Sequence, residues 1–175
     1  MKRYIICELE ESDIGIAKND QVEINNYRLR KAARGILIKG GKVALLNVTT
    51  KKYHKLPGGG IEKGEEIENA FKREVKEETG WDCEITDEGP VTIEYRNKLK
   101  ILQISYVFIA RAVGNPSEQQ LENDEITEGH DLEWVPIEKV EKILSEENPP
   151  GYEDRFITLR DQSIVSFYKD KLKKL

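Results

Sequence analysis

Apolar and polar positions divide the chain into segments with strand-like and helix-like patterns. Residues 32–38 and 42–48 are apolar runs rich in branched side chains, and Gly40 and Gly41 between them are typical of a hairpin turn. Residues 65–79 contain no proline or glycine and repeat their apolar side chains at helical spacing. The pattern therefore predicts a β-hairpin followed by an amphipathic helix.

The rest of the chain alternates in the same way between strands and helices. Further strands are predicted at 2–8, 21–24, 83–88, 91–95, 99–112 and 132–135, and further helices at 136–144 and 153–172. Residues 114–129 are polar and acidic and are expected to form a loop. This order favours an α/β fold with a mixed β-sheet flanked by helices. We expect one domain over residues 1–175, with an N-terminal strand extension at 1–29 and a C-terminal helix at 151–175.

The first predicted helix carries carboxylates on its apolar side. At about 100° per residue, Ala70, Phe71 and Val75 define an apolar arc that faces the core. Glu74 and Glu78 fall inside this arc, where a solvated charge run would not place them. Partly buried ionised carboxylates are costly unless a cation or a hydrogen-bond donor pairs with them.

Two kinds of cation could pair with these carboxylates. One alternative is a salt-bridged helix, in which Arg73, Lys72 and Lys76 neutralise the acids. The other is a hard divalent cation such as Mg²⁺ or Mn²⁺, for which carboxylate oxygens are suitable ligands. Glu77 lies on the flank of the apolar arc, so three carboxylates lie within about one turn. Placement in the apolar arc favours the metal.

A glycine run precedes this helix. The sequence LPGGG at residues 56–60 lets the backbone approach a ligand closely and adopt positive φ, although a run of this kind alone also suits a simple turn. We expect Gly64 to be the N-cap of the helix, Glu65 to lie in its first turn and Gly80 to follow its end.

The run and the helix together resemble the Nudix box, the motif of the Nudix hydrolase superfamily. All the fixed glycine, glutamate and arginine positions are present, and Trp81 is the one departure, at a place where the family usually has an aliphatic residue. The resemblance implies the Nudix α/β/α sandwich fold. It rests on the spacing Gly59-x5-Glu65-x7-Arg73-Glu74-Val75-x-Glu77-Glu78-x-Gly80-Trp81.

The resemblance also implies a divalent metal site and a reaction. The metal, Mg²⁺ or alternatively Mn²⁺, would be held by the carboxylates of Glu74, Glu77 and Glu78 and the carbonyl of Gly58. A pair formed by Arg73 and Glu65 would orient these ligands. Metal-activated water would then attack a phosphorus of a nucleoside diphosphate linked to another group.

A further acid is expected from a later loop. Glu128 lies six positions before Trp134, as a loop glutamate does in MutT-like members of the superfamily. The resemblance implies that Glu128 is an additional metal ligand or the general base. Glu125 and His130 are the alternatives for the base.

The TEGHDLEW stretch is most similar to MutT-like enzymes, so nucleoside triphosphate pyrophosphohydrolysis is the preferred activity. The alternative is a non-catalytic Nudix domain that binds a nucleotide ligand for regulation, which the intact box disfavours. The candidates for stacking on a nucleobase are Tyr27, Tyr53, Tyr106 and Phe108.

Composition limits the partners. A net charge of −5 over 175 residues argues against a broad nucleic-acid surface but not against a small-molecule nucleotide substrate, since a bound metal supplies local positive charge. The basic run at residues 51–55 could face phosphates, but we expect a solvated loop.

Cys7 and Cys83 fit no metal spacing and are typical of reduced thiols. No apolar run suits a signal peptide or a membrane span, so we expect a cytoplasmic protein with no membrane partner, and a homodimer stays open.

Overall fold

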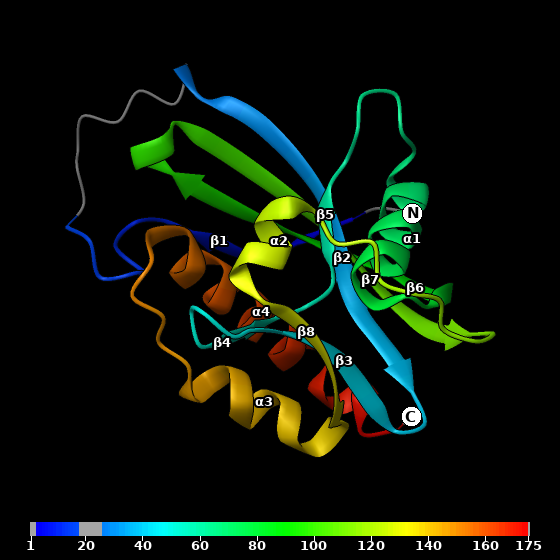
Figure 1. Cartoon of the computed structure of the whole chain (residues 1–175). Coiled ribbons are helices and arrows are strands. Elements are labelled where there is room, and N and C mark those ends of the chain that lie inside the picture. The colour runs from blue at the N-terminus through cyan, green and yellow to red at the C-terminus, as the bar shows by residue number, and fades with distance from the viewer. Residues whose placement is uncertain (1–2, 18–25, 175) are drawn as a thin grey trace.

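The computed structural model describes residues 3–17 and 26–174, which form one mixed sheet with helices on both sides (Figure 1). The strands are β1 (Ile5–Leu9), β2 (Arg28–Lys39), β3 (Lys42–Val48), β4 (Tyr53–Lys55), β5 (Gly58–Gly60), β6 (Asp82–Arg96), β7 (Ile101–Val113) and β8 (His130–Pro136). The helices are α1 (Ile67–Thr79), α2 (Asn123–Glu128), α3 (Ile137–Glu146) and α4 (Tyr152–Leu172), and η2 (Asn97–Leu99) is a short 3-10 helix.

Strands β2 and β3 diverge close to the hairpin turn that connects them. Strands β6 and β7 pair antiparallel, β2 pairs parallel with β7, and β1 pairs parallel with β6. Strand β3 pairs with β2 over only two residue pairs beside the hairpin turn, and the rest of β3 pairs with β4 and β8. The edge of β2 that β3 leaves free pairs with β5 instead. The glycine run therefore lies against β2, where β2 and β3 diverge.

Side-chain alternation along β2 distributes the core over both faces of the sheet. Ile36 and Ile38 belong to a cluster with Val140 of α3 and Ile164 of α4, whereas Leu37 packs in a separate cluster with Phe71 of α1. Helix α1 thus covers one face, and α3 and α4 cover the other (Figure 1). The expected α/β/α sandwich is confirmed.

The strands expected at 83–88 and 91–95 are one continuous strand, β6. The pairing of β6 with β7 shifts register twice, once before Asp87 and once between Glu88 and Val91. The second irregularity contains a Gly-Pro pair, which a β-bulge accommodates without ending the strand. Two separate strands were therefore the wrong prediction.

The acidic loop expected at 114–129 contains the short helix α2. The side chain of Glu125 accepts a hydrogen bond of 3.0 Å from the backbone N–H of Glu122 and so caps the first turn. This local capping is what turns part of a polar segment into helix.

Helix α1 begins at Ile67, not directly after Gly64. Glu65 stays outside the helix because its carboxylate accepts hydrogen bonds from the backbone of Glu62 and from the guanidinium of Arg73. The N-cap is Glu66, so the expected N-cap and first turn were wrong by two residues.

The strand predicted at 21–24 and the turn before it lie outside the described residues. Within residues 3–17 and 26–174, no helix combines the length and apolar character needed to cross a membrane.

Candidate functional site

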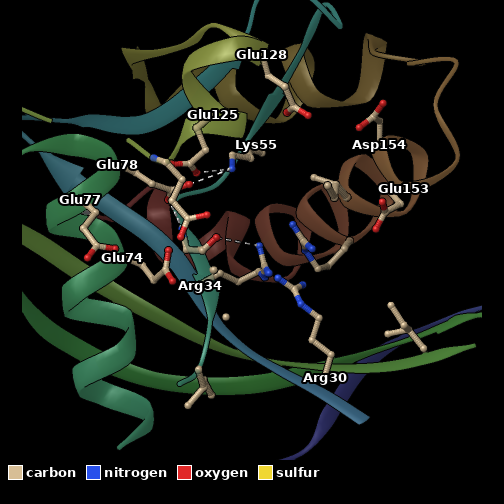
Figure 2. A pocket seen from close by; sticks show the side chains of 18 of the residues that line it. Arg30, Arg34, Lys55, Glu74, Glu77, Glu78, Glu125, Glu128, Glu153 and Asp154 are labelled. Atoms are coloured by element: carbon tan, nitrogen blue, oxygen red, sulfur yellow. Dashed lines mark hydrogen bonds and ion pairs between the residues drawn. The ribbon is translucent and has the colours of Figure 1, made fainter. Parts of the chain in front are cut away.

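A pocket of about 600 Å³ opens beside the glycine run (Figure 2). Carboxylates from α1 and from the segment around α2 line one part of it, and guanidinium groups from β2, β6 and α4 line another. The carboxylates are Glu74, Glu77, Glu78, Glu122, Glu125 and Glu128. We call Arg30, Arg34, Arg96 and Arg160 the arginine cluster. The pocket therefore has an acidic side, suited to cations, and a basic side, suited to anions.

The glycines bring β5 close to both neighbours. Gly58 has φ of 134°, and a Cβ there would collide with the backbone of Ala33 and Arg34 on β2. A Cβ on Gly59 would collide with the carboxylate of Glu74. The run is thus required for close packing around the acidic side.

Glu78 is the most buried carboxylate of the acidic side, with 1% of its surface exposed. The backbone N–H of Gly58 donates a 2.6 Å hydrogen bond to Oε2, and Lys55 Nζ lies 2.9 Å from Oε1. Burial raises the pKa of Glu78 to about 7, although the charge of Lys55 opposes this shift. The carboxylate is therefore incompletely compensated by the protein alone.

Arg73 holds three acids in fixed positions. Its Nε lies 2.9 Å from Oε1 of Glu65, and its Nη1 lies 2.9 Å from Oε1 of Glu74 and from Oε2 of Glu77. Its Nη2 also donates to the carbonyl oxygen of Gly60 at 2.9 Å. The pairing of Arg73 with Glu65 that the resemblance implied is present, and the guanidinium also reaches two of the expected metal ligands.

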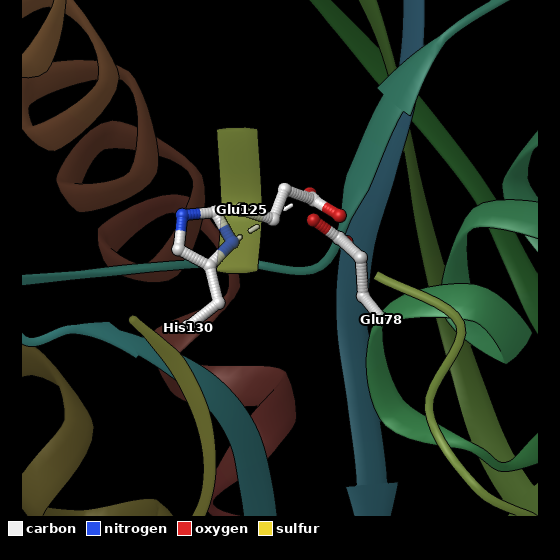
Figure 3. Close-up of side chains that lie close together, drawn as sticks. All are labelled: Glu78, Glu125 and His130. Atoms are coloured by element: carbon white, nitrogen blue, oxygen red, sulfur yellow. Dashed lines mark ion pairs between the residues drawn. The ribbon is translucent and has the colours of Figure 1, made fainter. Parts of the chain in front are cut away.

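A second group of ligand-type side chains surrounds Glu78. One atom each from Glu78, Glu125 and His130 lies within 4.8 Å of the other two, and the two carboxylates point toward one another (Figure 3). Burial would raise the pKa of Glu125, but the His130 ring, whose Nδ1 lies 3.6 Å from Oε1, and the hydrogen bond from the backbone N–H of Glu122 lower it to about 2. Of this carboxylate pair, Glu78 therefore retains a proton more readily.

Glu128, the acid expected from the sequence, lines the same pocket but has other partners. Lys51 Nζ lies 2.6 Å from Oε1 of Glu128, and His130 Nε2 lies 3.2 Å from its Oε2. Glu125, the alternative, is the acid of α2 that faces Glu78.

The residues of the acidic side fit a divalent cation. Their donors are carboxylate oxygens together with the Gly58 carbonyl, the oxygen ligands that Mg²⁺ and Mn²⁺ prefer. Six carboxylates face three side-chain cations, which are Lys51, Lys55 and Arg73. Burial and, to a smaller extent, the charge of Glu125 raise the pKa of Glu78, and a bound cation would oppose both effects.

Several residues of the pocket were not expected from the sequence. Lys51 and Lys55 line it, so the basic run is not the solvated loop that we expected. The arginine cluster was missed entirely. Its signal in the sequence was an arginine inside the apolar run of β2, at Arg34, and another on the buried face of α4, at Arg160.

The proposed base-stacking residues have different environments. Tyr53 lines the pocket although it is buried, and Tyr27 donates a 2.7 Å hydrogen bond to Asn97. Phe108 is fully buried and stacks on Phe71 in the core, so its ring does not reach a ligand.

Comparison with known proteins identifies the fold and the motif. A sequence model of the NUDIX domain matches residues 29–156. An ADP-ribose pyrophosphatase of Methanocaldococcus jannaschii is 42% identical over 65 residues, which cover 33% of this chain and 38% of that protein. An RNA pyrophosphohydrolase of Campylobacter jejuni is 44% identical over 55 residues, which cover 31% of this chain and 35% of that protein.

The matched segments thus span less than two fifths of either sequence relative. In structure, a NUDIX hydrolase from Nitrosomonas europaea superposes with a TM-score of 0.58 at 18% identity, over 76% of this chain and 89% of that chain. That likeness concerns the fold. Because the domain model covers most of the chain, including the glycine run and all of α1, this chain belongs to the NUDIX domain family.

Proposed function

We propose that this chain is a metal-dependent hydrolase that cleaves a diphosphate linkage in a nucleoside di- or triphosphate derivative, with MutT-like nucleoside triphosphate pyrophosphohydrolysis preferred. The observation that carries the proposal is the environment of Glu78. Its carboxylate is buried, lies against the Gly58 amide and faces Glu125 at the edge of an open pocket. A cation bound at these carboxylates would neutralise their charge, and the pocket beside them has room for a phosphate chain.

In this proposal, the carboxylates of Glu74, Glu77 and Glu78 and the carbonyl of Gly58 hold Mg²⁺, with Mn²⁺ as a substitute. When bound, the cation polarises phosphoryl oxygens and lowers the pKa of the attacking water. Arg73 keeps Glu74 and Glu77 in place, and Glu65 in turn orients Arg73.

An acid of α2 accepts the proton of the attacking water. Glu125 suits this role by its position, because its carboxylate faces Glu78 at the pocket and lies 3.6 Å from Nδ1 of His130. Glu128, the candidate from the sequence, is the alternative as base or as additional metal ligand, and His130 is a third candidate for the base.

A hydrolysis screen with Mg²⁺ tests the proposal. It should include nucleoside triphosphates, nucleotide sugars and dinucleotides, together with ADP-ribose and RNA, because the two sequence relatives are named ADP-ribose pyrophosphatase and RNA pyrophosphohydrolase. Release of phosphate or pyrophosphate is the expected result. Binding without release on every compound would favour the non-catalytic, ligand-binding alternative.

A matched pair of variants assigns the activity to this site. Glu78→Gln should lower turnover by about 100-fold or more, since the substitution removes a ligand charge and leaves the volume unchanged. Glu68→Gln, an exposed glutamate of the same helix, is the control. Equal activity of the two variants would contradict the metal assignment.

A further inference from the structure

The arginine cluster is a group of positive charges, three buried and one half-buried, that the proposed metal chemistry does not use. Arg34 is 4% exposed and Arg160 is 1% exposed, yet both line the pocket. Arg34 comes from β2 and Arg160 from α4, so the cluster exists only because α4 packs on the sheet beside the divergence of β2 and β3.

Two members of the cluster have carboxylate partners. Arg160 Nε lies 2.8 Å from Oδ1 of Asp161, and its Nη1 lies 3.2 Å from Oε1 of Glu94. Arg96 is paired with Glu94 and, through Nη1 at 2.8 Å, with Glu153. These three carboxylates position two guanidinium groups.

The other two members have none. Among the described residues, neither Arg30 nor Arg34 forms an ion pair with a carboxylate, and Arg30 instead donates to the side-chain amide of Gln103. Within residues 3–17 and 26–174, the side chain of Arg34 donates one hydrogen bond, to the carbonyl oxygen of Gly58 at 3.5 Å. Four guanidinium groups therefore face three carboxylates, and the two unpaired ones point into the same part of the pocket (Figure 2).

Some donors of the cluster are also unused. Nε of Arg34 and Nη2 of Arg160 are buried and have no hydrogen-bond partner in the part of the chain that the structure describes. Burial, reinforced by the charge of Arg160, lowers the pKa of Arg34 to about 9. Buried, unpaired charge of this kind is costly, and an anion with several acceptor oxygens would offset that cost.

The position of Arg34 connects the cluster to the metal side. The Gly58 carbonyl that Arg34 contacts is one of the proposed metal ligands, so a metal and the guanidinium would lie near each other. Two cations repel at such a distance unless an anion lies between them. A chain of phosphoryl groups can span from the acidic side to the arginine cluster and satisfy both.

We propose that the arginine cluster binds a phosphoryl group of the substrate outside the cleaved diphosphate, so that the enzyme prefers substrates with at least three phosphoryl groups over those with two. The inference rests on the proposed function for the position of the cleaved bond. A phosphoryl group suits the cluster better than a carboxylate does. Its charge approaches −2, which matches the two unpaired guanidinium groups, and planar guanidinium forks bind phosphate oxygens in pairs.

Calorimetric binding of two non-hydrolysable anions tests this preference without requiring turnover. Imidodiphosphate has two phosphorus atoms and diimidotriphosphate has three, and both are titrated in saturating Mg²⁺. For the unmodified chain, the Kd of the three-phosphorus anion should be at least about tenfold lower than the Kd of the two-phosphorus anion. The ratio of these two Kd values should fall to about threefold or less in Arg34→Met and in Arg30→Gln.

Controls separate binding from folding. Arg111→Gln changes an exposed arginine of β7 outside the pocket and should leave the ratio unchanged. Arg34→Met should keep or raise the melting temperature, because it removes an unpaired buried charge. An arginine with a purely structural role would lower the melting temperature and leave the ratio unchanged. The half-buried Arg30 gives a second variant whose folding is less at risk.

The outcomes distinguish the subsite from the proposed function. A ratio near one in the unmodified chain, or a ratio that survives both arginine substitutions, would overturn the subsite even if the chain hydrolyses a nucleotide with two phosphoryl groups. A ratio that both substitutions abolish supports the subsite even if no compound in the screen is hydrolysed.

Discussion

The ammonium group of Lys55 lies 2.9 Å from Oε1 of Glu78, a carboxylate that is otherwise enclosed by protein. The same ammonium group is 3.6 Å from Oε1 of Glu125. A side-chain cation thus stands between two acids of the proposed metal site. Lys55 and the proposed divalent cation would therefore neutralise the same negative charge.

Replacing Lys55 by Met should destabilise the protein mainly when metal is removed. In EDTA we expect the free energy of unfolding to fall by about 1–3 kcal/mol, limited by the ability of Glu78 to take up a proton. In saturating Mg²⁺, the fall in the free energy of unfolding should be smaller. Urea unfolding in both conditions measures the difference, with Lys63→Met, an exposed lysine, as the control. An equal loss with and without Mg²⁺ would argue against a shared role.

The kcat of Glu125→Gln should be at least about tenfold lower than the kcat of Glu128→Gln, because loss of a general base usually has a large effect on turnover. Glu125 faces Glu78, whereas Glu128 is paired with Lys51. Steady-state kinetics on a substrate found in the screen provides the comparison. A larger loss of kcat in Glu128→Gln than in Glu125→Gln would support Glu128 as the base, as the sequence predicted.

Arg73→Lys should raise the Mg²⁺ concentration needed for half-maximal activity and lower kcat. Lysine keeps the charge but cannot reach Glu65, Glu74 and Glu77 at once, because it lacks the planar fork of donors. Activity measured over a range of Mg²⁺ concentrations checks this, and Lys72→Arg on the exposed side of the helix serves as the control. An unchanged Mg²⁺ dependence would mean that Arg73 does not position the ligands.

His54 should make stability depend on pH. Its Nδ1 lies 2.5 Å from Oε1 of Glu147, and this hydrogen bond with the charges of Glu147 and Glu133 raises the pKa of His54 although burial opposes it. A raised folded-state pKa means that the contribution is complete below the ordinary histidine pKa of about 6.5 and is lost as pH rises through the folded-state value. Urea unfolding across this range should show the decline.

The decline in stability should disappear in His54→Gln and in Glu147→Gln. Glu146→Gln, an exposed neighbour, should retain it. A decline that persists without His54 would have another origin.

Half of the acidic side could be predicted because three of its six carboxylates lie on one helix. The rotation per residue alone places Glu74 and Glu78 on the apolar side of α1, and the structure buries Glu78 there. The glycine run follows in the same stretch of sequence. Helical geometry and a short loop are local properties, so the sequence carries them directly.

The basic side could not be predicted because its residues meet only through tertiary packing. Arg30 lies opposite Gln103 by the parallel register of β2 and β7, and Arg160 reaches Glu94 from α4. No local pattern specifies that register or the docking of α4. The choice between Glu125 and Glu128 depends likewise on how α2 is oriented relative to Glu78.

Asp161 accepts a 2.8 Å hydrogen bond from the backbone N–H of Leu56, the residue that leads into the glycine run, across 105 positions of sequence. Its neighbour Arg160 reaches Glu94 across 66 positions. During translation, the loop that carries Gly58 therefore lacks one of its anchors until residue 161 has left the ribosome. Contacts this distant in sequence form late. A nascent chain can thus form α1 long before the adjoining loop is anchored, and ligand-binding competence should arise only after residue 161 has been synthesised.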